Sequence, residues 1–530
     1  MAAATGIVLV GVVAYLCAWP VPAEPRSWIA PVPPGYVGAF APNTRLADLR
    51  TIDLGADSGP EHIAIGPDGK LYAAMNGGAL LRMQPDGANR ETFANTGGRV
   101  LGFDFDAQGR MIAADAMKGL LAIAPDGSIR VLADRVSADD PIRYANSIVV
   151  ARDGTIYFTD ASGRFAPSDW GGTLEASVLD ILEQAATGRV LAHDPATGLT
   201  RIVAHGFSFA NGIALSADEQ TLFVSETGRY RIWKVDHAAR DLDVRSGSLQ
   251  ASVLIDNLPG YPDNLMRGRD GRIWAGLFRP RNPAADGLSQ KPAMRKILLR
   301  LPSSLLPVGD PYGHVFAFTE DGRVVEDLQD PAGVYPQTTG VTETADRLYI
   351  HSLNAPKIGW LPRPASEDIY VLRSIREVKA PEVDWCAASR TGFEPFATDA
   401  ERFFSFWSIR SQPEDGRVVD VKQTRVAELR ACFGATPERA RQYFYAEIQL
   451  GEVSFRGSGE CLALMTDFPE PGLFPVRCQL VLSGLPAPYV GGLLTTNTIT
   501  SAARFGGESN PPGYTQASIA TIRLWRRAHQ

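Results

Sequence analysis

Oxygen-bearing side chains recur at one position of a repeated sequence pattern, and their types are those that bind hard cations. Each of four such residues precedes an aromatic residue of the next apolar stretch by 11 or 12 positions. Asn and Asp often begin turns, but each of these is followed directly by apolar residues typical of a strand. Carboxylate and amide oxygens are the ligands that Ca²⁺ takes in proteins. We therefore predict a Ca²⁺ site made by Glu61, Asn146, Asn211 and Asp263, with Asn264 beside the last.

The pattern around these residues predicts β-hairpins. In residues 209–226 (FANGIALSADEQTLFVSE) an apolar run is followed by a polar turn at 216–220 and then by an alternating strand. Similar hairpins occur at 61–72, 147–158 and 263–274, and weaker copies end at Met111 and Tyr349. Six such units predict a six-bladed β-propeller, in which equivalent positions of the innermost strands meet at one axis. The four predicted ligands, far apart in sequence, would then converge.

Composition limits the number of domains, the fold class and the kinds of partner that the chain can have. The chain has 530 residues, which favours two or three domains. It is 45% hydrophobic and 21% charged, and its 51 glycines and 38 prolines favour an all-β majority. The net charge of -7 gives no basic surface for nucleic acid. We assign residues 44–363 to the propeller and expect an outer strand within 43–54 to close the ring.

The N-terminus has the features of a targeting segment, assigned to residues 1–23. Ile7–Trp19 is apolar and uncharged, and with the residues before it approaches the length of a membrane helix. No Lys or Arg precedes it, which favours a retained anchor over a cleaved signal. We expect a protein anchored in a membrane and facing the periplasm or another extracytoplasmic side; the alternative is secretion after cleavage near Ala23. Residues 24–43 are Pro-rich and are expected to form a stiff, extended stalk that does not pack.

The last third of the chain is predicted to form a separate domain. We assign a charged linker to 364–380 and a small α+β or mostly β domain of unknown type to 381–530. A capping box at Thr398–Glu401 predicts an aromatic helix over 401–409, and Thr436-Pro437 predicts a second, short one. Strands are expected at 443–450, 478–482 and 517–525.

Five cysteines are distributed unevenly. Cys17 lies in the N-terminal apolar stretch, and the other four lie in the C-terminal domain: Cys386, Cys432, Cys461 and Cys478. Export favours at least one disulfide among these four, with three possible connectivities for two bonds. Zinc binding and buried free thiols are the alternatives, but no C-x-x-C spacing supports zinc.

Two stretches depart from the propeller repeat. Residues 162–187 contain a helical pattern at 174–184, and such insertions lie over one face of a propeller and tend to carry function. Residues 278–306 contain several basic side chains, among them Arg279, Arg281, Lys291, Arg295 and Lys296, which we interpret mainly as solvated, although they can also meet an anionic substrate.

Several stretches resemble the strictosidine synthase-like family, and within it the adipocyte plasma membrane-associated protein-like branch. They are residues 146–160, 188–226, 258–277 and 328–353, within a similarity that covers about 36–363. The resemblance implies a six-bladed propeller with a calcium on its axis. The family's calcium ligands match Glu61, Asn146, Asn211 and Asp263. The wider superfamily includes gluconolactonases and paraoxonases, which implies hydrolysis of esters or lactones.

Departures from the family pattern narrow these expectations. His62 and Ser147 stand where paraoxonases have acidic residues, which argues against a second calcium. No counterpart of the paraoxonase histidine pair is evident, and we interpret His62 and His351 as packing residues. No residue matches the glutamate base of strictosidine synthase, which argues against alkaloid condensation.

Two functions of different classes follow. The first is a calcium-dependent hydrolase of small-molecule esters or lactones, in which the metal polarises the carbonyl and Asp263 accepts a proton from water. The second is a non-catalytic, membrane-anchored propeller that binds a protein partner or lipid, with structural calcium. Nothing in the sequence identifies a protein partner.

Overall fold

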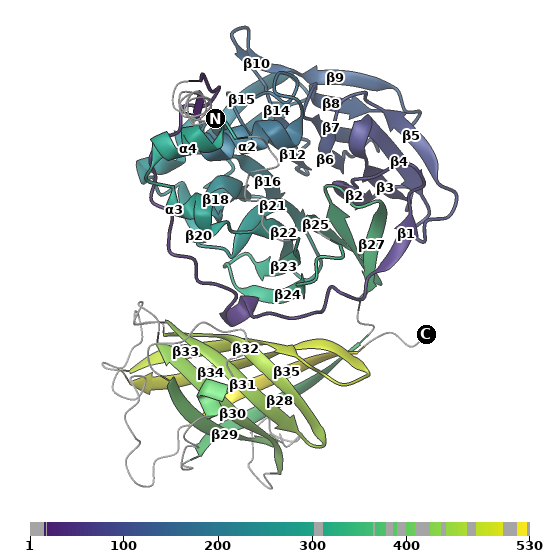
Figure 1. The fold of residues 1–530 in the computed structure, drawn as a ribbon. Helices are drawn as coiled ribbons and strands as arrows, with labels where there is room; N and C mark the ends of the chain where they lie inside the picture. Colours follow the sequence, from purple (N-terminus) through teal and green to yellow (C-terminus); the bar gives the residue numbers. More distant parts are fainter. Residues whose placement is uncertain are drawn as a thin grey trace, which may run out of the picture.

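The computed structural model describes residues 15–16, 19–301, 311–335, 337–363, 366–377, 385–388, 399–408, 424–435, 441–463, 473–501 and 517–526. These residues form two all-β parts, a ring of sheets and a barrel that lies against one side of it (Figure 1).

The ring is a six-bladed propeller, which confirms the prediction from the hairpin repeat. Five blades begin at the axis with strands that follow one another in sequence. They are β2 (His62–Ile65), β3 (Leu71–Ala74), β4 (Ala79–Met83) and β5 (Glu91–Asn95); β6 (Val100–Phe105), β7 (Met111–Asp115), β8 (Gly119–Ile123) and β9 (Ile129–Ala133); β12 (Ala145–Val150), β13 (Ile156–Asp160), β14 (Gly188–Asp194) and β15 (Leu199–Phe207); β16 (Ala210–Leu215), β17 (Thr221–Glu226), β18 (Arg231–Asp236) and β20 (Ala251–Ile255); and β21 (Gly260–Arg267), β22 (Arg272–Pro280), β23 (Gly313–Thr319) and β24 (Val324–Asp330).

The sixth blade closes the ring. It consists of β25 (Thr338–Glu343), β26 (Arg347–Ser352) and β27 (Lys357–Pro362), and its outer strand is β1 (Arg50–Asp53) from the start of the chain. The outer strand expected within 43–54 is therefore confirmed. Strand β19 (Leu242–Asp243) adds to the third blade by pairing with β15. Two further short strands, β10 (Arg135–Ser137) and β11 (Asp140–Pro141), pair with each other.

The propeller's core lies between its blades. Each blade is one sheet, and both of its faces pack against a neighbouring blade. Strands such as β8 and β13 are therefore buried along their whole length. This explains why their sequences are nearly continuous apolar runs without alternation. Close contact of the backbones requires small residues at the axis. A Cβ on Gly212 of β16 would lie 2.3 Å from the backbone nitrogen of Leu265 on the next blade.

Helices gather on one face of the ring (Figure 1). The first insertion contains α2 (Thr173–Glu183), which confirms the predicted helix, and the second contains α3 (Pro283–Gly287) and α4 (Pro292–Leu298). Phe165 and Ala176 of the first insertion pack with Leu101, Tyr144 and Phe209 from the loops and strands around the axis. The insertion therefore covers the end of the axis at which the predicted ligands lie.

The expected free stalk is wrong, because the segment 24–43 packs along the propeller. Backbone groups of Glu24 and Arg26 bond to Glu183 at the end of α2. Trp28 lies 6.2 Å from the ring of Tyr230, and η1 (Gly38–Phe40) contacts β24. The apolar and aromatic residues between the prolines supply the surface for this packing.

The N-terminal segment 1–23 lies mostly outside the described residues, which include only 15–16 and 19–23 of it. In the portion of the chain that the structure describes, no helix is long and apolar enough to cross a membrane.

The C-terminal part is a closed barrel of eight antiparallel strands (Figure 1). Its interior is lined by alternate residues of each strand, and many of these form a continuous apolar core. The strands are β28 (Ser366–Glu377), β29 (Asp399–Ser408), β30 (Arg425–Ala435), β31 (Arg441–Leu450), β32 (Val453–Ala463), β33 (Leu473–Ser483), β34 (Tyr489–Ser501) and β35 (Ala517–Arg526).

Two expectations for this part are wrong. Most of the expected linker 364–380 is β28, which pairs with β29 and β35, so the domain begins before residue 381. The expected helix over 401–409 is β29, since its aromatic residues favour a strand that has pairing partners on both sides. The second helix, expected at Thr436-Pro437, lies outside the described residues. The three expected strands are confirmed within β31, β33 and β35.

Two disulfides confirm the cysteine prediction. Cys461 and Cys478 face each other on neighbouring strands inside the barrel, while Cys386 joins the short helix α5 (Trp385–Ala388) to Cys432 of β30.

Candidate functional site

The predicted ligands lie where the innermost strands are irregular. The pairing of β12, β16 and β21 with their neighbours shifts register around Asn146, around Asn211 and around Asp263 with Asn264. Such β-bulges redirect side chains. Glu61 directly precedes β2, and its N–H donates to the carbonyl of Ala74 at 3.1 Å. At the axis, the innermost strands of the third, fourth and fifth blades therefore contain an irregularity that presents a polar side chain.

A contact across the axis joins the two ends of the predicted set. The Asn264 side-chain nitrogen donates to both the backbone oxygen and Oε1 of Glu61, each at 3.2 Å. Burial raises the pKa of the Asp263 carboxyl, and the neighbouring side chain of Asn211 offsets part of this rise. These residues come from the first, fourth and fifth blades, so the structure brings together Glu61, Asn211, Asp263 and Asn264.

Three buried oxygen atoms of this group have no hydrogen-bond partner among the described residues. They are Oε2 of Glu61, Oδ1 of Asn211 and Oδ1 of Asn264. A buried oxygen without a partner is costly, and three of them in one place form a group of acceptors suited to a cation or a hydrogen-bond donor. Two carboxylates and neutral amide oxygens form a hard-oxygen set that fits Ca²⁺.

The charges of the two carboxylates are only partly balanced. Burial raises the pKa of both the Glu61 and the Asp263 carboxyl, and for Glu61 the negative charge of Asp263 adds to this effect. Arg99 Nη2 lies 3.7 Å from Glu61 Oε2 and is the cation that acts on Glu61. A divalent cation at the axis would stabilise the ionised form of both groups.

Asn146 occupies the equivalent position of the third blade, where it is buried. Its side chain forms no hydrogen bond with the other four predicted ligands in the described structure. The two blades without a predicted ligand have Leu101 and Thr339 within their corresponding register shifts. Thr339 donates through its hydroxyl to the backbone oxygen of Glu61 at 3.1 Å.

Arg99 and Tyr144 belong to the site but were not predicted from the sequence. Arg99 is buried, donates to the backbone oxygen of Gly59 at 3.3 Å, and has no hydrogen-bond partner for Nη2 among the described residues. Burial raises the pKa of Tyr144, and the negative charges of Glu61 and Asp263 add to this effect. The only signal for Arg99 in the sequence is an isolated charge before an apolar strand, and such charges are usually solvated.

His62 and His351 meet beside the site, although the sequence places them almost at opposite ends of the propeller. Their rings lie 5.5 Å apart, and His62 also packs 4.6 Å from Phe103. Burial lowers the pKa of His62 to about 3 and that of His351 well below its usual value, so both are neutral. Their packing role agrees with the expectation from the sequence.

Comparisons with known proteins found similar sequences for the propeller part of this chain. The family described as "Strictosidine synthase-like, N-terminal" matches residues 38–83, and "Strictosidine synthase" matches 146–237. Protein STRICTOSIDINE SYNTHASE-LIKE 6 of Arabidopsis thaliana is 32% identical over 321 residues, which cover 58% of this chain and 80% of that protein. Adipocyte plasma membrane-associated protein of Danio rerio is 29% identical over 359 residues, 63% of this chain and 83% of that protein.

Among solved structures, a gluconolactonase from Xanthomonas campestris matches with a TM-score of 0.42 and 22% identity, over 64% of this chain and 98% of that one. The sequence relatives and the two family matches decide the assignment: this chain belongs to the strictosidine synthase-like family.

Proposed function

We propose that the propeller binds one Ca²⁺ at its axis and hydrolyses small-molecule esters or lactones there. The observation that carries this proposal is the group of buried oxygens without partners, Glu61 Oε2, Asn211 Oδ1 and Asn264 Oδ1, beside the carboxylate of Asp263. Asn146 would complete the ligand set from the third blade. The apolar stretch 7–19 would hold the enzyme at a membrane, facing the extracytoplasmic side.

A bound Ca²⁺ would supply an electrophile for the carbonyl oxygen of the substrate. Residues of the protein would stabilise the oxyanion and accept the proton. Arg99 Nη2, which has no hydrogen-bond partner, can donate to the oxyanion that forms when water attacks the carbonyl. The Asp263 carboxylate can accept the proton of that water. The cover formed by the first insertion would limit the access of bulk water.

One observation favours a second function, a non-catalytic propeller with structural calcium. All five predicted ligands are buried, at 0–8% exposure, and they come from four blades. A cation held there would tie these blades together whether or not any substrate reached it. Such a propeller would bind a protein or lipid through another surface.

The experiment that separates the two functions is a hydrolysis assay on the full-length protein. Bound calcium is measured by elemental analysis, and a panel of aryl esters and lactones is assayed with and without chelator. Circular dichroism after chelation distinguishes loss of activity from loss of fold. Tight calcium binding without hydrolysis of any substrate would favour the non-catalytic function, and unchanged hydrolysis after complete metal removal would exclude the proposed role of calcium.

A further inference from the structure

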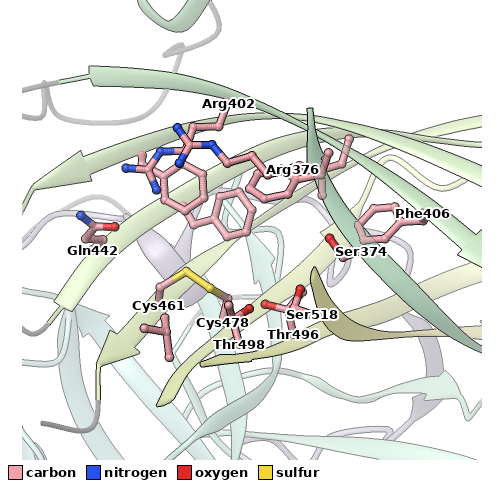
Figure 2. A pocket seen from close by; sticks show the side chains of 15 residues that line it. Ser374, Arg376, Arg402, Phe406, Gln442, Cys461, Cys478, Thr496, Thr498 and Ser518 are labelled. Atoms are coloured by element: carbon pink, nitrogen blue, oxygen red, sulfur yellow. A yellow bond between two sulfur atoms is a disulfide. The ribbon is translucent and has the colours of Figure 1, made fainter. Parts of the chain in front are cut away.

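The C-terminal barrel contains a cavity of about 70 Å³ that is separate from the propeller axis. All eight strands contribute residues to its lining, and Figure 2 shows them around a common space. Eight-stranded barrels have an interior just wide enough for side chains or for one small ligand. A water molecule needs about 10–15 Å³ of such space, so this cavity accommodates a ligand of roughly six non-hydrogen atoms.

Two arginines enter this cavity from neighbouring strands. Arg376 of β28 and Arg402 of β29 both line it, and in Figure 2 their guanidinium groups lie close together. Burial and the positive charge of Arg376 lower the pKa of Arg402 to about 10, and burial lowers that of Arg376. Among the described residues no carboxylate forms an ion pair with either arginine, although the guanidinium of Arg402 stacks 4.5 Å from the ring of Phe433. Two unpaired cations in one half-buried space are unfavourable unless an anion joins them.

The rest of the lining determines what kind of anion fits. Near the other side of the cavity lie the hydroxyls of Ser374, Thr496, Thr498 and Ser518, and the walls between are apolar. The apolar wall is formed mainly by Phe404, Phe406, Leu429, Phe444 and Val476. A site with mostly apolar walls and a few charged groups at one end is suited to a small amphipathic ligand. Arginine's planar fork matches the two oxygens of a carboxylate.

We propose that the barrel binds a small carboxylate with a short apolar body, its head between Arg376 and Arg402 and its body against the phenylalanines. A carboxylate is also the kind of product that ester hydrolysis releases, but this inference does not depend on the function proposed for the propeller. It rests on the barrel alone.

The test is isothermal titration calorimetry of the full-length protein with sodium butyrate, which has six non-hydrogen atoms. Acetate and hexanoate are titrated at matched ionic strength. Each added CH₂ should strengthen binding by about fourfold from acetate to butyrate, and the gain should stop by hexanoate because the cavity is full. Inorganic phosphate serves as the competing anion. Absence of butyrate binding, or phosphate binding as tight as that of butyrate, would overturn the proposal.

Variants identify the residues responsible. Arg402→Gln and Arg376→Gln should each weaken butyrate binding by about tenfold or more. The control Arg477→Gln, on the exposed outer face of β33, should leave it unchanged. Thermal unfolding without ligand provides the second measurement: removing an unpaired cation should leave the melting temperature unchanged or raise it. A lower melting temperature in Arg402→Gln, together with lost binding, would mean that the arginine supports the barrel's fold and would also overturn the proposal.

Discussion

The hydroxyl of Ser225 donates a hydrogen bond of 2.6 Å to the backbone oxygen of Asp263 on the next blade. The same hydroxyl accepts the N–H of Gly212 within its own blade at 2.7 Å. Thr159 repeats this arrangement one blade earlier, since its hydroxyl accepts the N–H of Ser147 at 3.0 Å and donates to the backbone oxygen of Asn211 at 2.6 Å. Hydroxyls on second strands thus fix the backbone of two predicted ligands.

Replacing Ser225 by alanine should therefore destabilise the propeller and weaken its calcium site. Two buried backbone groups, Gly212 N–H and Asp263 C=O, would lose a partner, at a cost of about 1–3 kcal/mol. Chemical denaturation measures the stability, and calorimetry the calcium affinity. Ser252→Ala, on the exposed face of β20, is the matched control and should change neither quantity. Equal behaviour of the two variants would contradict the positioning role of Ser225.

Asp263→Ala and Asn146→Ala should lose activity to different extents. The first removes a negative ligand and the proposed proton acceptor, so excess calcium should not restore hydrolysis. The second removes a neutral oxygen, so only calcium affinity should fall and excess calcium should restore part of the rate. The measurement is ester or lactone hydrolysis as a function of calcium concentration. Recovery of Asp263→Ala at high calcium would show that its carboxylate is not the proton acceptor.

Arg99→Gln should lower kcat by roughly 100-fold, because a donor to the oxyanion is lost. Arg99→Lys, which keeps the charge, should retain part of the activity. Calcium binding should instead become tighter in Arg99→Gln, because a positive charge close to Glu61 has been removed. A parallel loss of calcium affinity and activity would indicate that Arg99 acts only by supporting the site's structure.

Asp180 of α2 should make the protein less stable as pH rises. It is buried, accepts a hydrogen bond of 2.7 Å from Ser162, and burial raises its pKa from 3.8 to about 7. The folded state therefore binds this proton more tightly than the unfolded state. The stabilising contribution is fully present below pH 4 and disappears between pH 4 and 7, with an upper limit of roughly 4 kcal/mol.

The check is chemical denaturation from pH 4 to pH 8 on wild type and Asp180→Asn. The variant should lack this part of the pH dependence and be the more stable protein at pH 8. Asp169→Asn, at an exposed position of the same insertion, should follow the wild type. An identical pH profile for Asp180→Asn and wild type would refute the assignment.

The four cysteines of the barrel should be unreactive in exported protein. Denaturation without reductant should expose at most one thiol, that of Cys17, because both barrel pairs are bonded. After reduction, four further thiols should react. Replacing either pair by serine should destabilise the barrel by about 2–5 kcal/mol. Four reactive thiols in unreduced protein would contradict both bonds.

The sequence was sufficient to predict the propeller because a hairpin repeat is local. Apolar runs separated by polar turns define each inner hairpin, and six copies in phase leave few other architectures. The same phase selected Glu61, Asn146, Asn211 and Asp263, since equivalent positions of a ring face one axis. The β-bulges that turn these side chains were not evident, because a bulge depends on the register with the neighbouring strand.

Contacts between distant segments were decided only by the tertiary structure. His62 meets His351 because the ring closes between the first and last blades. Arg99 approaches Glu61 because the first and second blades pack side by side at the axis. The first barrel strand resembled a linker because its apolar residues Ile369 and Val371 point outward and are about half exposed. A strand usually turns its apolar residues toward the core, and here they face the other way. Closure of the barrel decides which side of each strand faces inward, and it depends on pairing between strands that are far apart in sequence, such as β28 and β35. Arg376 and Arg402 face one cavity because this closure places them both on the inner side.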